Sequence, residues 1–301
     1  MKKTALILLA SIIALLSSCK FGPYQFAFTE ENVEDRSRTI TRLQGPYLPS
    51  GTNGLSTYSF LIVTDMHIGA GHYKHNHNGF FIWFQTMMNC PDPTKRPQFI
   101  INLGDIADSG RLSEFKDYYI WSEKVRDIAR NSIDGIQDFK IYSVVGNHDL
   151  YNNGRNYFLN YTYPHIYSYC FDFANNSSTQ GFEFYFLDSG NGTLGRYQLE
   201  DLQSKMKKSS KPKIILSHYP VYAGGILVVT LQDTLECAKI LTIGAENNVK
   251  LMLEGHAHRH YTYNYGRMYE EVTPSYASNN AVNLITVDET LGTCVTDIKY
   301  F

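Results

Sequence analysis

The feature of this 301-residue sequence that most restricts its fold is a set of short apolar runs, each ending in a polar cluster. The runs occupy residues 59–64, 98–103, 140–145, 182–187, 213–216 and 249–253. Continuous apolar runs of this length are typical of strands buried on both faces. Helical patterns lie between several of them, at residues 114–128 and 199–206. Strands that alternate with helices predict a layered α/β fold.

Near the end of the chain, two extended runs follow one another directly. Residues 280–287 and 293–300 are joined through Gly292, which favours a closing β-hairpin. The composition, with 43% hydrophobic and 19% charged residues, is that of a globular protein and excludes a disordered chain. The formal net charge of −2 includes no basic excess, so we expect no nucleic-acid binding surface.

The first residues of the chain are predicted to form a targeting segment. Lys2 and Lys3 precede residues 5–16, of which only Ser11 is not apolar. A membrane-spanning helix needs about 20 apolar residues, so this run is too short to span and is typical of a signal-peptide core. We therefore expect residues 1–18 to be a signal peptide and the protein to leave the cytoplasm.

The residues at the end of this core, Leu16-Ser17-Ser18-Cys19, resemble the lipobox of bacterial lipoproteins. The resemblance implies that Cys19 is the lipidation site and the first residue of the mature chain. It also implies an extracytoplasmic protein of the bacterial cell envelope that is held at a membrane by its N-terminal lipid. The alternative is an ordinary secretory signal cleaved near Ser18, with Cys19 incidental.

The mature chain divides into two parts by its sequence pattern. Residues 19–55 have little periodic apolar pattern and contain Gly22-Pro23 and Gly45-Pro46, so we expect a tether and lead-in segment. Residues 56–301 carry the strand and helix patterns and are predicted to form one domain.

Four cysteines remain beyond Cys19, and none of them belongs to a C-x-x-C pair. They are Cys90, Cys170, Cys237 and Cys294. Their even number allows two disulfides, in any of about three connectivities, if the compartment is oxidising. Four separate thiols are the alternative, and neither metal binding nor redox use is indicated.

The polar clusters at the ends of the apolar runs carry oxygen and nitrogen donors and no sulfur. The donors are Asp65, His67, Asp105, Asn147, His218, His256 and His258. Ligands of open α/β sheets bind outside the carboxyl ends of strands, which is where these residues fall. Oxygen and nitrogen donors suit metals such as Mn, Fe, Zn or Ni. Seven donors are too many for one four-coordinate zinc, so they indicate two metals that share a bridging carboxylate.

The order of these clusters resembles the calcineurin-like metallophosphoesterase superfamily. Its pattern of D-x-H, G-D-x-x-D, G-N-H-D, a lone His and G-H-x-H is matched by residues 65–67, 104–108, 146–149, 218 and 255–258. The resemblance implies a layered β-sandwich flanked by helices, with a dimetal site at the carboxyl ends of the strands. It implies two divalent or trivalent transition-metal ions as cofactors and a phosphate ester as substrate.

The resemblance also assigns a role to each residue of the site. The first metal takes Asp65, His67, Asp105 and His258, and the second takes Asp105 as the shared bridge, Asn147, His218 and His256. His148 binds no metal and faces the phosphate, and Asp108 holds His148 in position. The implied activity is hydrolysis of phosphomonoesters or phosphodiesters by a hydroxide that bridges the metals, with His148 assisting. Arg111 and Arg155 lie close in sequence to these residues and are weaker candidates for phosphate contacts.

The sequence departs in two places from the motifs of particular subfamilies, which argues against a purple acid phosphatase and against a protein phosphatase. Purple acid phosphatases carry a metal-binding Tyr three residues after the bridging Asp, where this chain has Asp108. The chain also lacks the Arg-bearing extensions of the protein phosphatases.

A non-catalytic, surface-binding lipoprotein on the same scaffold is the alternative function, but such proteins usually lose ligands and none of the seven is missing here.

Other polar and aromatic residues are given structural interpretations. We expect His72, His75 and His77 to lie on a solvated loop, with lining of the cleft or binding of an extra metal as the alternatives. Asp188, after the fourth apolar run, is expected to be structural. The tyrosine-rich residues 151–169 are expected to be a packed insertion, with a recognition surface as the alternative.

Overall fold

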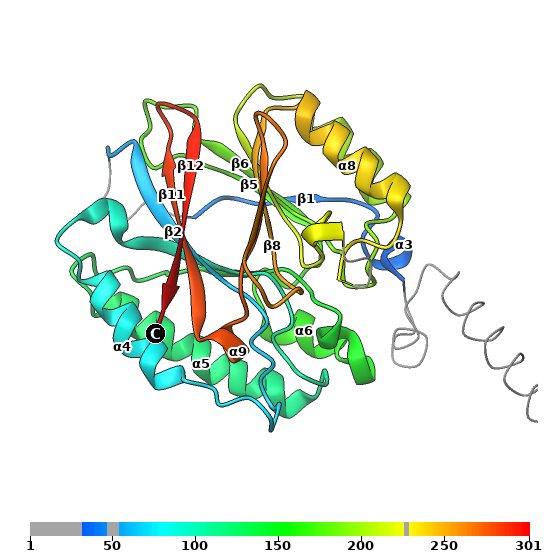
Figure 1. The fold of residues 1–301 in the computed structure, drawn as a ribbon. Helices are drawn as coiled ribbons and strands as arrows, with labels where there is room; N and C mark the ends of the chain where they lie inside the picture. Colours follow the sequence, from blue (N-terminus) through cyan, green and yellow to red (C-terminus); the bar gives the residue numbers. More distant parts are fainter. Residues whose placement is uncertain (1–31, 47–53, 226–228) are drawn as a thin grey trace, which may run out of the picture.

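The computed structural model describes residues 32–46, 54–225 and 229–301 of the protein (Figure 1). The expected signal peptide and the lipobox with Cys19 lie outside the described residues. Within the described ranges, no helix has the length and apolar character needed to cross a membrane.

Two mixed β-sheets form the centre of the fold. The seven-stranded sheet has the order β1 (Thr41–Arg42), β5 (Tyr169–Phe173), β6 (Phe182–Phe186), β7 (Lys213–Leu216), β8 (Val249–Glu254), β10 (Tyr269–Val272) and β9 (Tyr261–Asn264). The five-stranded sheet has the order β12 (Thr293–Tyr300), β11 (Ala281–Asp288), β2 (Thr57–Val63), β3 (Pro97–Asn102) and β4 (Ile141–Ser143). The predicted α/β fold with layered sheets is confirmed, and strands occupy all six apolar runs.

Aromatic side chains fill the space between the two sheets. Phe60 and Phe99 of the five-stranded sheet pack against Phe184 of the seven-stranded sheet, with ring centroids 5.4 and 5.8 Å apart. Phe171 lies next to them, 6.2 Å from Phe99. All four side chains are fully buried. Such pairs stabilise a core by about 0.5–1.5 kcal/mol each beyond the burial of their surface, so this layer fixes how the sheets face each other.

Helices cover the outer faces of both sheets (Figure 1). Helices α4 (His77–Met88) and α5 (Leu112–Arg130) pack side by side against the five-stranded sheet. Helices α7 (Arg196–Met206) and α8 (Thr234–Glu246) cover the seven-stranded sheet. The other α-helices of the described residues are α3 (Val33–Arg36), α6 (Arg155–Tyr161) and α9 (Tyr276–Asn279). The sequence patterns predicted α5 and α7 but not α4, whose apolar residues leave little contrast between its two faces.

The C-terminal hairpin is present as expected. Strands β11 and β12 pair antiparallel from Ala281 with Tyr300 to Asp288 with Thr293. Strand β11 also pairs antiparallel with β2, and this pairing places the hairpin at the edge of the five-stranded sheet. The four cysteines beyond Cys19 are unpaired, which agrees with the alternative of separate thiols.

The expected tether over residues 19–55 differs from what the structure shows for residues 32–46. Helix α3 begins after Asn32, whose side chain accepts a hydrogen bond from the Asp35 N–H. Strand β1 then pairs parallel with β5, so this part of the chain belongs to the domain. A one-turn helix and a two-residue strand are too short to leave a periodic apolar pattern in the sequence.

The strand directions explain where a site can form. Strands β2, β3 and β4 run parallel to one another, as do β6, β7 and β8 in the other sheet. Parallel strands place their carboxyl ends at one edge, and the loops that leave that edge carry the polar clusters.

Candidate metal centre

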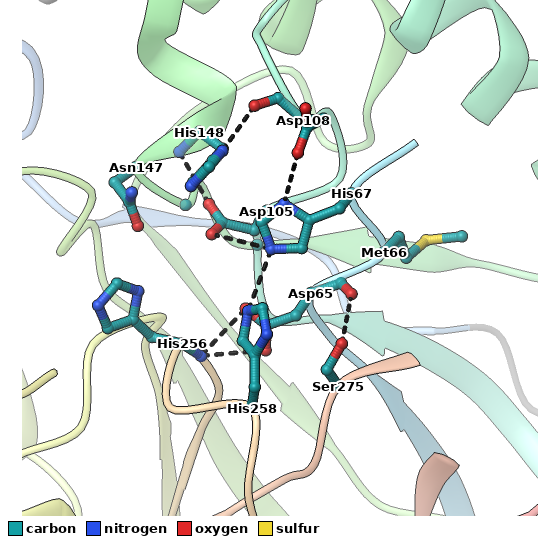
Figure 2. Close-up of polar contacts among 12 residues, drawn as sticks. Asp65, Met66, His67, Asp105, Asp108, Asn147, His148, His256, His258 and Ser275 are labelled. Carbon is teal, nitrogen blue, oxygen red and sulfur yellow. Dashed lines mark hydrogen bonds and ion pairs between the residues drawn. The ribbon is translucent and has the colours of Figure 1, made fainter. Parts of the chain in front are cut away.

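Loops from both sheets meet at one place, and the predicted ligands lie on them (Figure 2). The five-stranded sheet contributes the loops after β2, β3 and β4, and the seven-stranded sheet contributes those after β7 and β8. In chain order, these loops carry Asp65, His67, Asp105, Asn147, His218, His256 and His258. The structure therefore brings together all seven predicted ligands, although they span almost 200 residues of sequence.

The backbone of this region is unusual, because several ligand positions adopt left-handed conformations. The non-glycine residues with positive φ include Asp65 (51°), His67 (43°), Asp105 (51°), His256 (61°) and His258 (54°). Conformations of this kind cost on the order of 1–3 kcal/mol each and persist only where the surroundings enforce them. Their concentration on the predicted ligands marks the region as a functional site.

Main-chain hydrogen bonds hold the first of these turns in place. The N–H of Asp65 donates to the Gly104 carbonyl at 3.0 Å, and the N–H of His67 donates to the Asp105 carbonyl at 2.9 Å. The Ser275 hydroxyl donates to the Asp65 carbonyl at 2.9 Å (Figure 2). The loops after β2 and β3 are thus linked to each other and to the segment before α9.

Asp105 lies between the two halves of the site. Its Oδ2 is 3.3 Å from His218 Nε2 and 3.7 Å from His67 Nε2, and its Oδ1 accepts the His148 N–H at 2.8 Å. The main chain of Gly146 approaches this carboxylate so closely that a Cβ on Gly146 would collide with it. A buried carboxylate that reaches both groups of ligands has the position required of a bridge.

The other donors converge on either side of Asp105. On one side, His258 Nε2 is 3.1 Å from His67 Nε2 and 3.4 Å from Asp65 Oδ1. On the other side, His218 Nε2 is 3.1 Å from both Asn147 Oδ1 and His256 Nδ1.

The donor chemistry fits two metal ions. Two of the compact groups able to hold a metal are Asp65 with His67 and His258, and Asp105 with His218 and His256. A third group, His67 with Asp105 and His148, overlaps the first. The imidazole nitrogens lie close to one another and to carboxylate oxygens. Such a set of nitrogen and oxygen donors suits a borderline metal cation better than it suits hydrogen bonding among neutral side chains.

Two of the histidines are oriented on the far side of the ring, His218 by a hydrogen bond and His67 by an ion-pair contact. His218 Nδ1 donates to the Leu103 carbonyl at 2.8 Å, which leaves Nε2 to face Asp105. His67 Nδ1 lies 3.3 Å from Asp108 Oδ1, which leaves its Nε2 to face the same carboxylate. Contacts of this kind fix the tautomer and the direction of a metal-binding imidazole.

Asp108 holds His148 as expected, but it does so through its main-chain carbonyl and not through its carboxylate. Its carboxylate contacts His67 and not His148, and this contact with His67 lowers the pKa of Asp108. His148 is held by the main-chain carbonyl of Asp108, to which its Nδ1 donates at 2.6 Å (Figure 2). The sequence could not separate these two roles, because the side chain and the carbonyl of one residue point in different directions.

Asn147 and His148 are adjacent in the sequence, but their side chains point apart (Figure 2). An extended backbone would direct adjacent side chains to opposite sides. Instead, Asn147 has φ −73° and ψ −35°, and His148 begins a 3-10 helix, His148–Asn153. The start of this helix directs the two side chains apart (Figure 2).

The charges of the site are strongly coupled. Burial disfavours ionisation of Asp105, but His218 and His148 outweigh it and hold the pKa of Asp105 well below its usual range. Burial likewise opposes the charge on His218, but Asp105 raises its pKa to about 9. Burial and the neighbouring His218 lower the pKa of His256 to about 3. Because buried carboxylates need a cation nearby, a metal can take the place of the proton on these imidazoles.

Sequence reasoning missed a supporting carboxylate, Asp149. It is fully buried and accepts the N–H of Ala107 and the N–H of Gly146, both at 2.9 Å. Burial and the nearby Asp105 raise the pKa of Asp149 to about 7. Its place inside the 146–149 motif is the only sequence signal for this role, which is to join the loops after β3 and β4.

Three tyrosines surround the ligands and were also missed. The Tyr151 hydroxyl accepts from Asn147 Nδ2 at 3.2 Å, which directs the amide oxygen towards His218. The Tyr219 ring stacks on His256, with centroids 3.8 Å apart. The Tyr73 ring lies 5.6 Å from His67. The expected packing of residues 151–169 is seen at Phe158 and Tyr167, whose rings stack, but Tyr151 faces the site.

The histidines after the first motif are only partly on a solvated loop. His72 is exposed, whereas His75 Nε2 donates to the Met66 carbonyl at 2.8 Å and His77 begins α4 beside the Tyr276 hydroxyl. His75 therefore bonds to the loop after β2, and His77 bonds to Tyr276 of α9. Arg111 is exposed at the start of α5.

Fold and site together define a metal-dependent hydrolase of phosphoric esters. The calcineurin-like phosphoesterase family matches residues 58–260, and the chain belongs to this family. No curated protein matches the chain.

Solved structures share the fold at low sequence identity. A dimetal phosphatase from Danio rerio is 15% identical, with a TM-score of 0.54 over 79% of this chain and 98% of that one. GAP50, the anchor in the inner membrane complex of Plasmodium, is 16% identical, with a TM-score of 0.53 over 81% of this chain and 88% of that one. At these identities the likeness extends to the fold alone.

Replacing Asp108 by Ala removes the carboxylate beside His67 and keeps the carbonyl that holds His148. We expect Asp108→Ala to bind one metal equivalent about 10–100-fold more weakly, the usual cost of losing a partner of a metal-binding histidine. Metal content after dialysis against a graded chelator measures this, with Asp138→Ala, an exposed carboxylate, as the control. Full metal retention with a loss of turnover would instead mean that Asp108 acts through His148.

Proposed function

We propose that this protein hydrolyses phosphomonoesters or phosphodiesters at the dimetal centre around Asp105, and that it does so as a lipid-anchored protein of the bacterial cell envelope. The observation that carries the enzymatic part is the complete set of seven donors, six of which converge on either side of the seventh, the buried carboxylate of Asp105. A non-catalytic binding protein on the same scaffold has no need to keep every donor in this arrangement.

The residues present fit the metals that the family requires. Asp65, His67 and His258 would hold the first ion, and Asn147, His218 and His256 would hold the second, with Asp105 shared between them. When bound, such a pair of ions activates a water molecule as nucleophile and stabilises charge on the attacking and leaving oxygens. Reconstitution of the metal-free protein with single metals identifies the metals that support activity.

The side chain of His148 supplies the remaining chemistry. Its Nδ1–H is committed to the Asp108 carbonyl, so Nε2 is the atom that can meet the substrate. A proton held on Nε2 would stabilise negative charge on a non-bridging phosphate oxygen or pass to the leaving alkoxide. The main-chain N–H of His148 donates to Asp105 Oδ1, which keeps this residue beside the centre.

Metal removal tests the activity and the bridge together. The protein stripped by chelator is expected to lose hydrolysis of phosphomonoesters and phosphodiesters, and to regain it with Mn, Fe, Zn or Ni.

Asp105→Ala should bind fewer metal ions than His67→Ala, because a bridge serves both sites and His67 serves one. Elemental analysis of the two variants decides the point, and equal metal content in both would remove Asp105 from the bridging role.

Replacing His148 separates catalysis from binding. We expect His148→Ala to keep the fold and metal content and to lose about 10²–10⁴-fold in kcat on an ester with a poor leaving group. An activated aryl ester should lose less if Nε2 donates a proton, and equally if the ring only stabilises charge. His165→Ala, an exposed histidine bonded to the Leu159 carbonyl, is the control. Loss of metal, or full activity on every ester, would contradict the role given to His148.

The lipid anchor rests on the short apolar core and the Leu16-Ser17-Ser18-Cys19 sequence. One acyl chain binds membranes only marginally, whereas the several chains of a lipoprotein N-terminus give a stable anchor. Cys19→Ala is therefore expected to block processing or to release soluble protein, as read by membrane fractionation and by the mass of the mature N-terminus. A variant that is processed and fractionates like the parent would exclude lipidation at this residue.

A further inference from the structure

A buried ion pair joins the N-terminal segment to the catalytic domain. The guanidinium of Arg36, on α3, donates to Asp188 through Nε at 2.7 Å and through a terminal nitrogen at 2.9 Å. The side chains of Arg36 and Asp188 are 3% and 0% exposed. Arg36 lies outside residues 58–260, the part of the chain that matches the family. The ion pair therefore links the family-matched part of the chain to a residue outside it.

Further contacts fix the geometry of this pair. Asp188 also accepts the Ser37 hydroxyl at 2.7 Å and the Gly190 N–H at 3.0 Å. The Arg36 guanidinium lies 5.5 Å from the centre of the Tyr167 ring. A planar guanidinium can bind the two carboxylate oxygens through two different nitrogens and lie flat on an aromatic ring, a geometry that a single ammonium nitrogen does not reproduce. The N-terminal segment therefore holds the turn that follows β6 in one position.

The turn after β6 also supports His218, a predicted metal ligand. Ser189 is fully buried, and its hydroxyl oxygen accepts the N–H of His218 at 3.0 Å and the N–H of Tyr219 at 2.9 Å. His218 is a predicted ligand of the second metal, and the ring of Tyr219 covers His256, another of its ligands. Movement of Ser189 would therefore displace the main chain that carries His218.

The same turn also lies against the loop of Asn147. A Cβ on Gly190 would lie 2.8 Å from the Leu150 side chain, 3.3 Å from the Gly146 carbonyl oxygen and 3.4 Å from the Arg36 guanidinium. The turn after β6 thus lies between the N-terminal segment and the loop after β4. The turn therefore contacts the loop that carries Asn147 and the main chain of His218, and through Tyr219 it reaches the ring of His256. These three residues are the ligands assigned to the second metal besides the shared Asp105.

We infer that residues 32–42 form part of the second metal site, with Arg36 positioning His218 through Asp188 and Ser189. This inference rests on the proposed role of His218 as a metal ligand. Arg36, Asp188 and Ser189 are positioning residues that touch neither metal nor substrate. A purely structural role would lower thermal stability without distinguishing between the two metals, whereas the positioning role predicts selective weakening of one metal.

The test compares the affinities of the two metal equivalents. The metal-free mature chain is titrated with Zn²⁺ against a competing chelator, for the parent and for Ser189→Ala, Arg36→Lys and His218→Ala. Ser189→Ala and Arg36→Lys are expected to weaken one equivalent about 10–100-fold and to leave the other within about twofold. Arg38→Ala is the matched control, because Arg38 lies in the same segment but is 60% exposed and pairs with Asp35.

The outcomes separate this inference from the proposed function. Unchanged affinities for both equivalents in Ser189→Ala and Arg36→Lys, together with loss of one equivalent in His218→Ala, would overturn the positioning role alone. Two retained equivalents in His218→Ala would overturn the ligand assignment itself. If Arg36→Lys does not fold, Ser37→Ala takes its place, since it removes one hydrogen bond from the N-terminal segment to Asp188 and leaves the ion pair intact.

Discussion

The buried carboxylate of Asp105 is the interaction on which the arrangement of the site depends. Both sheets send loops to it: His67 and His148 approach from one side and His218 from the other. An ionised carboxylate removed from water is costly unless opposite charge or hydrogen-bond donors surround it. The imidazoles meet this requirement in the protein alone, and metal ions meet it in the family to which the chain belongs.

The rest of the molecule holds these groups in conformations that they would not adopt alone. Asp65, Asp105 and His256 have left-handed backbones, and such strain survives only on a rigid support. The aromatic layer between the sheets, centred on Phe99, and the main-chain bonds between the β2 and β3 loops provide that support. Stability of the fold and precision of the site therefore come from the same packing.

Residues outside the motifs also shape the site. Asp149 joins two ligand loops, Tyr151 orients the amide of Asn147, and Ser189 holds the main chain of His218. These contacts surround the ligands with oriented partners, and the loss of such a partner typically lowers metal affinity about 10–100-fold. The N-terminal segment reaches this layer through Arg36, so the described residues 32–42 are structurally continuous with the catalytic domain.

The sequence by itself determined the layered α/β fold, the six buried strands and the family, because apolar runs and short polar motifs are local features. It also named the residues that the structure brings together, since parallel strands place their carboxyl ends at one edge. Only the tertiary structure decided that the Asp108 carboxylate faces His67, that His75 supports the β2 loop, and that residues 32–46 belong to the domain. These features depend on contacts between segments far apart in the chain and on the direction of single side chains, which no local pattern records.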